Sequence, residues 1–563
     1  MTCCVWRRSL SFLLVLLLIL PAVQITTKAE EPRHFAIRGA RIVTVSGGVI
    51  ENGTVVVSDG LIAAVGANAT VPPEAWLIDG KGLTVYPGFI DAQTDLGLQT
   101  ATPPAGPGGG GGQPGQQQQA AQPAPTGPED RLATTPWVNA ADEIRVTDRR
   151  IATWRDAGFT TALSAPARGI FPGQGAVINL AGERPGHMVV QTPATLQVAF
   201  QGGGGFGGGY PGSLMGVIAY LRQVFLDAQH YAMAQPILAK NPRSRERIRY
   251  DRAERVISAA MRAERPVLMP VSSQVQMKRA ADLVDEFKLK AVFVGAHYAY
   301  EDPAWLGQKK IPVIASLRWP EKPRDADPER EETLRTLRHR DKAHTNPAAL
   351  HKAGVKFAFY SDGVANPKDA IKNAKKAIDA GLPADAAVRA FTLSAAEILG
   401  VADRLGSIEQ GKIANLVVTD GDIFNERTKV KMVFVDGRRF EIREEERPRE
   451  RPTVNMTGTW TLNVNTPNGA VVATANLRME PDGALSGGIS SQMGAATISR
   501  GWVSGNQFSF TFSMNVGGPS PQEIVMSGTV EGNNLKGSAS VGGQAMEVTG
   551  TKPGAAMSEG GAL

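Results

Sequence analysis

The sequence contains very little cysteine, because only Cys3 and Cys4 occur among its 563 residues. Both precede an apolar run at 10–20, which follows two arginines and leads to Pro21. This pattern is typical of a secretory signal peptide covering 1–29, and the run is too short for a convincing membrane span. Cleavage would remove both thiols, so we expect neither a disulfide nor a cysteine nucleophile in the mature chain.

An uncleaved N-terminal anchor is the alternative interpretation of the same segment. Both interpretations place the bulk of the chain outside the cytoplasm, in the periplasm or secreted. The formal net charge of +6 overstates the mature protein, because the signal segment carries Arg7, Arg8 and Lys28. The sequence also lacks a basic stripe interleaved with aromatic residues, so we expect no nucleic-acid partner.

Phosphate-binding motifs are absent as well. Two tracts, at 102–128 and 201–210, are rich in glycine, but neither is followed by Gly-Lys-Ser or Gly-Lys-Thr. The first consists of Gly, Pro, Gln and Ala with almost nothing to bury, and it predicts a low-complexity insertion.

Short alternating runs begin the mature chain. The runs at 36–45, 54–57 and 61–65 predict strands, with Asp59-Gly60 as a hairpin turn. Further along, strand patterns alternate with helical ones, which is typical of an α/β domain. The predicted strands lie at 158–163, 173–180, 266–270, 291–297, 311–317 and 354–363, and the predicted helices at 142–156, 213–233 and 243–264.

The segment 86–95, Tyr-Pro-Gly-Phe-Ile-Asp-Ala-Gln-Thr-Asp, combines a turn with the start of a buried strand. With the Gly-Ser-Ile-Glu-Gln-Gly-Lys pattern at 406–412, it resembles the amidohydrolase superfamily, specifically the imidazolonepropionase- and dihydroorotase-like branch. The resemblance covers about 33–442. It implies a (β/α)8 TIM-type barrel at 86–400 and a composite β-sandwich built from both flanks, 30–85 and 401–442.

In that family His-x-His follows the Pro-Gly-Phe-Ile-Asp motif and binds a divalent metal. Here Gln93 and Asp95 stand at those positions, and Pro270 stands where a later strand carries a metal-binding His. His297 lies at or within two residues of another family ligand. Asp362 matches the family Asp that contacts the metal and shuttles a proton.

The resemblance therefore implies a degenerate metal site, with Asp362 as the candidate catalytic residue. Gln93, Asp95 and His297 are the candidate ligand-pocket residues, and we expect no metal ligand set and no cofactor. The competing interpretations are a packed histidine at position 297 and a turn-forming Asp-Gly pair at 362–363. His339 and His344, in a charged stretch, are expected at the surface.

A charged, proline-punctuated linker at 443–452 precedes a different pattern. Short alternating runs separated by turn signals, such as Asp482-Gly483, predict a C-terminal antiparallel β-barrel or sandwich at 453–552. A ligand-binding role and a docking role both remain open for it.

Two functional classes follow. One is an exported, non-catalytic or divergent homologue that binds a small molecule or supports a paralogous active subunit, with no membrane span after signal cleavage. The alternative is a metal-dependent hydrolase of carbon–nitrogen bonds other than peptide bonds, such as those of cyclic amides. Its rebuilt site would use Asp95, His297 and Asp362, and this carboxylate-rich set would hold a weakly bound hard divalent cation.

Overall fold

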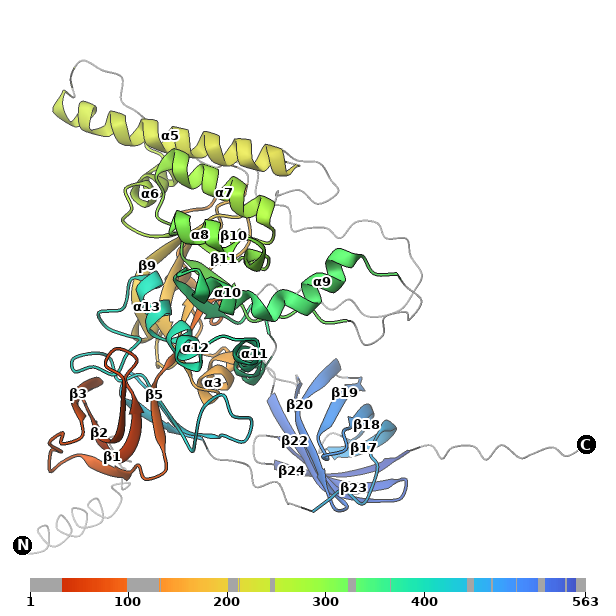
Figure 1. The fold of residues 1–563 in the computed structure, drawn as a ribbon. Helices are drawn as coiled ribbons and strands as arrows, with labels where there is room; N and C mark the ends of the chain where they lie inside the picture. Colours follow the sequence, from red (N-terminus) through yellow and green to blue (C-terminus); the bar gives the residue numbers. More distant parts are fainter. Residues whose placement is uncertain are drawn as a thin grey trace, which may run out of the picture. The chain divides into compact units, whose positions relative to one another are not determined.

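The computed structural model describes most of the chain in two compact units, Met1–Ile442 and Arg443–Leu563 (Figure 1). The described residues are 33–98, 131, 133–200, 211, 213–241, 243, 249–322, 331–364, 366–442, 450–466, 469–492, 494–514, 522–541 and 544–552. The predicted signal peptide, the insertion at 102–128, the glycine-rich tract at 201–210 and most of the predicted linker lie outside them. None of the helices within these ranges combines the length and the apolar character that a membrane span requires.

Strands from both flanks of the first unit form one eight-stranded sheet. β5 joins the flanks, because it pairs parallel with β1 and antiparallel with β14. The order is β16-β15-β14-β5-β1-β2-β3, with β4 beside β1. Phe35 of β1 packs edge-on against Phe434 of β15, 5.4 Å between ring centroids, although their strands are not neighbours. The two ends of this sheet therefore share one core. The strands are β1 (His34–Val43), β2 (Val49–Ser58), β3 (Leu61–Gly66), β4 (Trp76–Asp79), β5 (Thr84–Pro87), β14 (Leu416–Thr419), β15 (Val430–Val435) and β16 (Arg438–Glu441).

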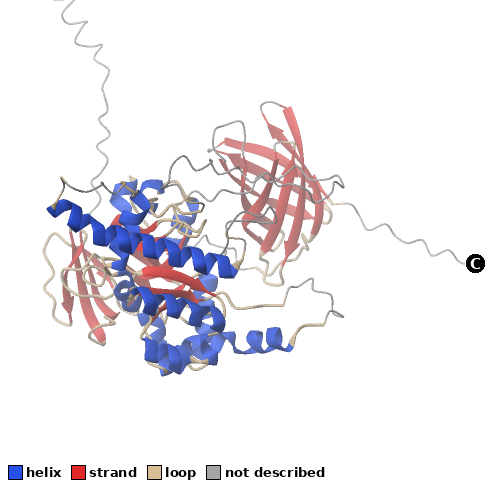
Figure 2. Ribbon diagram, turned by 90° about the horizontal axis from the view of Figure 1, so that it is seen from above, coloured by secondary structure: helices blue, strands red, loops and turns tan. Residues whose placement is uncertain are grey.

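A second eight-stranded sheet holds the strands between the flanks, paired in chain order from β6 to β13. Its two edge strands approach each other, because the Ser361 backbone N–H, just after β13, donates to Asp91 Oδ1 of β6 at 3.1 Å. Figure 2 shows helices around these strands. The strands are β6 (Phe89–Thr94), β7 (Phe159–Ser164), β8 (Gln174–Asn179), β9 (Val189–Gln197), β10 (Val267–Val271), β11 (Ala291–Gly295), β12 (Val313–Ser316) and β13 (Phe357–Tyr360).

One strand departs from the regular (β/α)8 pattern that the resemblance implies. β8 runs antiparallel to both β7 and β9, whereas the other paired strands of this sheet run parallel. The connection from β7 to β8 contains no helix, and the next one contains only the single-turn α4 (Pro185–Met188). Parallel pairing needs a crossover of roughly a dozen residues or more, so these short connections return the chain antiparallel.

Successive residues of the strands pack into two different clusters. Leu268, Val292 and Ile314 belong to one buried cluster, whereas Val267, Phe293 and Val313 belong to another. Because side chains alternate across a strand, the two faces of this sheet are both covered by apolar packing. The helices and 3-10 turns of the unit are α2 (Ala140–Glu143), α3 (Arg149–Asp156), α5 (Leu214–Lys240), α6 (Arg252–Met261), α7 (Gln274–Phe287), η1 (Ala299–Glu301), α8 (Pro303–Lys309), α9 (Leu334–Lys342), η2 (Ala343–Thr345), α10 (Asn346–Lys352), α11 (Pro367–Asp379), α12 (Ala384–Phe391) and α13 (Leu393–Leu399).

Gly88 explains why the Pro-Gly motif precedes β6. A Cβ atom at this position would lie only 2.0 Å from the Thr160 hydroxyl oxygen of β7. Glycine alone permits this close approach of the two strands. The motif at 86–95 therefore sets the register at which the sheet begins.

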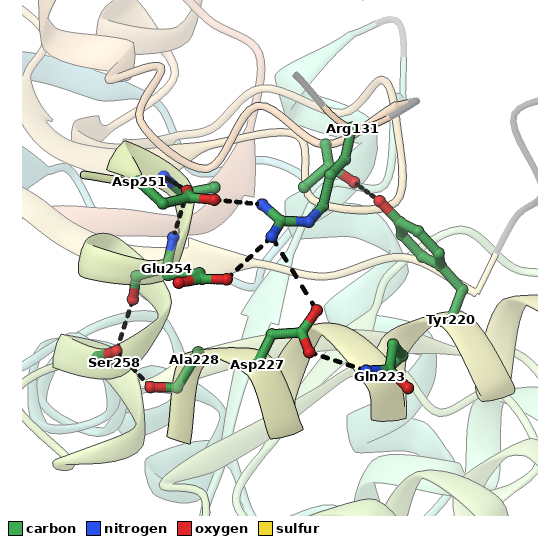
Figure 3. A network of polar contacts seen from close by, with 10 residues as sticks. Arg131, Tyr220, Gln223, Asp227, Ala228, Asp251, Glu254 and Ser258 are labelled. Atoms are coloured by element: carbon green, nitrogen blue, oxygen red, sulfur yellow. Dashed lines mark hydrogen bonds and ion pairs between the residues drawn. The ribbon is translucent and has the colours of Figure 1, made fainter. Parts of the chain in front are cut away.

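The long helix α5 is fastened to α6 through Arg131 (Figure 3). The Arg131 guanidinium donates to Asp251 at 2.8 Å and to Glu254 at 2.9 Å, and both acids lie at the start of α6. Asp227 of α5 lies 4.0 Å from the same group. The Arg131 side chain is 19% exposed, so this ion cluster is largely shielded from water.

The second unit is a closed antiparallel barrel of eight strands, which confirms the β-barrel prediction. β17 pairs with both β18 and β24, so the barrel closes and leaves no free edge. Trp460 is fully buried inside and donates from Nε1 to the Met456 carbonyl at 2.9 Å. The strands are β17 (Gly458–Thr466), β18 (Gly469–Met479), β19 (Leu485–Ser491), β20 (Gly494–Ser504), β21 (Gln507–Met514), β22 (Gln522–Glu531), β23 (Asn534–Val541) and β24 (Gln544–Thr551).

Candidate functional site

Polar side chains gather where several strands of the second sheet end. Ser316 and Tyr360 are the last residues of β12 and β13, and Asp362 follows two residues after β13. His297 follows two residues after β11. Because these strands are parallel neighbours, their carboxyl ends lie at the same edge, which is the usual place for a site in parallel α/β sheets.

Asp362 is the centre of this group. Its Oδ2 atom accepts a hydrogen bond from Ser316 Oγ at 2.7 Å and lies 3.8 Å from His297 Nε2. The backbone of Asp362 is left-handed, with φ +52°, and Gly363 follows with φ +71°. Asp tolerates this conformation better than most residues. The turn interpretation and the site interpretation of Asp362 therefore describe one geometry, in which the turn positions the carboxylate.

His297 has an altered proton affinity. Burial lowers the pKa of its imidazole, the Asp362 carboxylate opposes this shift, and the Arg318 guanidinium adds to it. The net direction is downward, which favours the neutral imidazole. A neutral ring offers one donor and one acceptor nitrogen, so His297 can both give and accept a hydrogen bond here.

Tyr360 is a site residue that the sequence interpretation did not identify. It precedes Asp362 by two residues, and the charge of that carboxylate disfavours loss of the phenolic proton. Burial and the nearby charges of Asp362 and Asp91 hold the pKa of this phenol well above its usual range. Tyr360 therefore keeps its proton and acts as a hydrogen-bond donor. The available signal was its position at the strand end, two residues before Asp362.

Asp91 is fully buried, and burial raises the pKa of its carboxyl to about 7. Its Oδ1 accepts from the Ser361 backbone, whereas its Oδ2 has no hydrogen-bond partner among the described residues. The Gln93 Oε1 atom, also on β6, is buried and likewise lacks a partner in the described ranges. Two side-chain oxygens on β6 are therefore left without a hydrogen-bond partner from these parts of the protein.

The structure does not bring Asp95 to this group. Its Oδ1 atom pairs with Arg150 Nη1 at 2.7 Å, and its side chain is 43% exposed. Asp148 holds the same guanidinium, accepting from Arg150 Nη2 at 2.8 Å and from Nε at 3.0 Å. Asp148 also caps α3 by accepting from the Arg150 backbone N–H. The carboxylate of Asp95 is thus committed to the start of α3.

These residues do not fit the hydrolytic metal that the resemblance implies. A catalytic zinc takes three protein ligands and leaves one position open. His297 and Asp362 lie together, but Asp95 pairs with Arg150 and Pro270 has no donor atom in its side chain. Across the described ranges, no three side chains of His, Cys, Asp or Glu converge closely enough to hold an ion.

An aromatic group forms beside His297. The His339 ring of α9 stacks on Tyr298, with 4.0 Å between centroids and 18° between planes. Its Nδ1 atom lies 3.2 Å from the Tyr300 hydroxyl, and the Arg335 guanidinium lies 5.0 Å above the Tyr298 ring. His339, expected at the surface, is instead half-buried in this stack, because its neighbours come from the loop after β11. Such contacts between distant segments have no signature in local sequence.

The comparisons with known proteins agree with this fold. The model of the amidohydrolase family matches residues 331–440, which include Asp362. No curated protein matches the chain.

An amidohydrolase of Thermotoga maritima MSB8 is similar in structure, with a TM-score of 0.59 and 25% identity, over 72% of this chain and all of that one. An adenosine deaminase of Xanthomonas campestris with bound zinc aligns over 73% of this chain and 94% of its own, with 17% identity and a TM-score of 0.39. Residues 331–440 of the first unit are thus similar to the amidohydrolase family, and the structural similarity to the Thermotoga maritima amidohydrolase extends over 72% of the chain.

Proposed function

We propose that this chain is an exported amidohydrolase-superfamily protein that binds a small molecule at the carboxyl edge of a TIM-type barrel, without a hydrolytic metal. The observation that carries the proposal is the Asp95–Arg150 ion pair of 2.7 Å. This ion pair engages the Asp95 carboxylate, which a metal site would need as a third ligand. Only His297 and Asp362 then remain, and a catalytic zinc takes three protein ligands.

The remaining groups suit recognition of a polar molecule. Asp362 accepts hydrogen bonds, neutral His297 can donate or accept, and Tyr360 keeps a phenolic proton. Asp91 Oδ2 and Gln93 Oε1 are buried and have no hydrogen-bond partner in the described residues. A buried polar atom of this kind costs about 1–3 kcal/mol unless a partner arrives. A ligand or an ordered water can supply that partner.

A divergent, non-catalytic role is one form of this proposal, and support of a paralogous active subunit is another. The alternative function is hydrolysis of carbon–nitrogen bonds, which the match to the amidohydrolase family over 331–440 favours. It would require Asp95 to leave Arg150 and join His297 and Asp362 around a hard cation such as magnesium or manganese.

The test measures both ligand binding and hydrolysis with the full mature chain. A panel of small polar molecules is screened by thermal shift with the wild type, Asp362→Asn and His297→Ala. In parallel, dihydroorotate and hydantoin hydrolysis is followed with and without added manganese. The proposal expects at least one stabilising molecule whose effect weakens in both variants, and no manganese-dependent turnover. Manganese-dependent hydrolysis that Asp362→Asn abolishes would replace it with the hydrolase.

A further inference from the structure

The outer side of α5 carries large apolar side chains that are exposed. Figure 1 shows this helix at the outside of the first unit, beside α6 and α7. Its inner side packs into the core, where the rings of Phe225 and Phe287 lie 5.1 Å apart between centroids. On the outer side, Met215 is 80% exposed, and the other large exposed residues are Leu226, Met233 and Ile237. A helix that is apolar on all sides is ordinarily buried on all sides, so the outer side of α5 has the composition of a contact surface.

These four residues belong to one row of exposed positions, the outer stripe. The row recurs every three or four residues, so its members lie on the same side of the helix. The outer stripe consists of Met215, Ala219, Gln223, Leu226, Gln229, Met233 and Ile237. Exposed apolar residues scattered singly need no explanation, but a connected row of them marks an interaction site.

The outer stripe is symmetric about Leu226. Every other member has a counterpart at the same distance on the opposite side of this residue. The pairs are Gln223 with Gln229, Ala219 with Met233, and Met215 with Ile237. A two-fold axis at Leu226 would therefore bring each residue opposite its counterpart in an antiparallel second helix. The small Ala219 then meets the long Met233, so the stripe is complementary to itself.

The polar residues of the stripe fit a second copy better than a lipid surface. Gln223 Nε2 donates to Asp227 Oδ1 at 2.8 Å, so the carbonyl oxygen of Gln223 can accept from Gln229 of the second copy. Lipid would bury these amides without partners, which is costly. The antiparallel arrangement also places the positive end of each helix dipole beside the negative end of the other.

The charges beside the stripe permit the same arrangement. Arg222 and His230 lie four positions on either side of Leu226, so they would face each other across the axis. Glu286 of α7 already accepts from Arg222 Nε at 2.8 Å and neutralises its charge. The second copy therefore meets an ion pair at this position and not a lone cation.

We propose that the outer stripe of α5 is the contact surface of a homodimer, in which α5 of a second copy packs antiparallel about a two-fold axis at Leu226. The stripe extends over about 33 Å of helix. Two helices packed along this length, about 10 Å apart, cover less surface than the roughly 800 Å² per partner of a standard interface. The dimer is therefore reversible, with a dissociation constant on the order of 10 μM. It does not depend on the small-molecule site proposed above.

The experiment follows the mass of the full mature chain by sedimentation velocity from about 1 to 200 μM, because self-association depends on concentration. Thermal unfolding checks that each variant is folded. Leu226→Glu places two carboxylates against each other at the axis. Its control is Leu337→Glu on α9, because the two leucines are similarly exposed, 44% and 45%. We expect a monomer–dimer equilibrium that Leu226→Glu weakens at least about tenfold and Leu337→Glu leaves unchanged.

A pair of opposite charges tests the antiparallel register. Ala219→Glu and Met233→Lys should each weaken the dimer, whereas the double variant should regain it, because each Glu then faces a Lys of the second copy. The two positions lie about 21 Å apart within one helix, too far to pair in the same copy.

Three results would overturn the proposal. They are a wild type that stays monomeric over the whole concentration range, a dimer that Leu226→Glu leaves intact, and a double variant that associates no more tightly than the single ones. A monomeric wild type that binds phosphatidylcholine vesicles, and loses this binding in Leu226→Glu, would assign the outer stripe to a membrane surface instead.

Discussion

Arg150 Nη1 lies 2.7 Å from Asp95 Oδ1, and this pair separates Asp95 from the polar group around Asp362. Asp148 fixes the arginine from the other side, and it also accepts from the Gly97 backbone at 2.9 Å. A network of acidic and basic side chains therefore joins the segment after β6 to the start of α3. The carboxylate of Asp95, which the resemblance assigns to a ligand position of the family, contributes to local structure here.

The buried carboxyl of Asp91 predicts an unusual pH dependence of stability. Its pKa rises from 3.8 to about 7 on folding, so between these values the folded chain binds more protons than the unfolded chain. The free energy of unfolding should then fall as the pH rises from about 4 to 7, by up to about 4 kcal/mol.

Asp91→Asn should remove this contribution and flatten the curve in that window. Urea denaturation at several pH values measures it, with Asp403→Asn as the control, because that side chain is 72% exposed. A wild-type curve with the same slope as the Asp91→Asn curve would contradict the buried, protonated carboxyl.

The buried amide of Asn415 predicts a large loss of stability on truncation. Its Nδ2 donates to Thr161 Oγ1 at 2.9 Å and to Asn179 Oδ1 at 2.8 Å, while its Oδ1 accepts from the Asp436 backbone. Asn415→Ala would remove all three hydrogen bonds and leave the Asp436 N–H without this acceptor, at about 2–4 kcal/mol. Denaturant unfolding measures the change. Asn425→Ala, at an exposed turn, should cost well under half of it, and equal costs would show that the network contributes little.

The ion cluster of Arg131 gives a second stability prediction. Arg131→Met leaves Asp251 and Glu254 as uncompensated acids, 12% and 14% exposed, so we expect a loss of about 3 kcal/mol. Arg222→Met breaks an ion pair with Glu286 whose partners are 42% and 38% exposed, and it should cost below about 1 kcal/mol. Thermal unfolding of both variants tests this order. A smaller effect for Arg131→Met would contradict the shielded cluster.

The second unit should fold by itself. Its core, centred on Trp460, Phe508 and Phe510, consists of residues from this unit alone, and its barrel closes on itself. A fragment of 450–552 should therefore show β-type circular dichroism and one cooperative unfolding transition. A blue-shifted tryptophan emission should be lost on that transition. An unstructured fragment would show that this barrel depends on the first unit.

Much of the fold was predictable because alternation is local. The runs predicted as strands at 36–45 and 54–57 correspond to β1 and β2, and the alternating C-terminal runs correspond to strands of the barrel. The direction of β8 was not predictable from its own residues, because it follows from the short connections on either side. The predicted helix at 243–264 begins only at Arg252, where Asp251 caps it.

The site was predictable only in part. The resemblance identified Asp362 and His297, which the structure brings to 3.8 Å. The resemblance also grouped Asp95 with them. In the structure the Asp95 carboxylate instead accepts a hydrogen bond from Arg150, 55 positions further along the chain. Tyr360 and Ser316 join the group because strand ends meet in space, and His339 joins through stacking on Tyr298. Pairings between distant segments of this kind leave no local pattern.

Zinc content is the most direct test of the central proposal, that this chain does not bind the metal ion of the family. The full mature chain is incubated with zinc, dialysed extensively, and analysed for metal beside Asp362→Asn. We predict well below one zinc ion per chain, with no difference between the two proteins, because His297 and Asp362 alone cannot supply three ligands. One zinc ion retained per wild-type chain and lost in Asp362→Asn would contradict the claim.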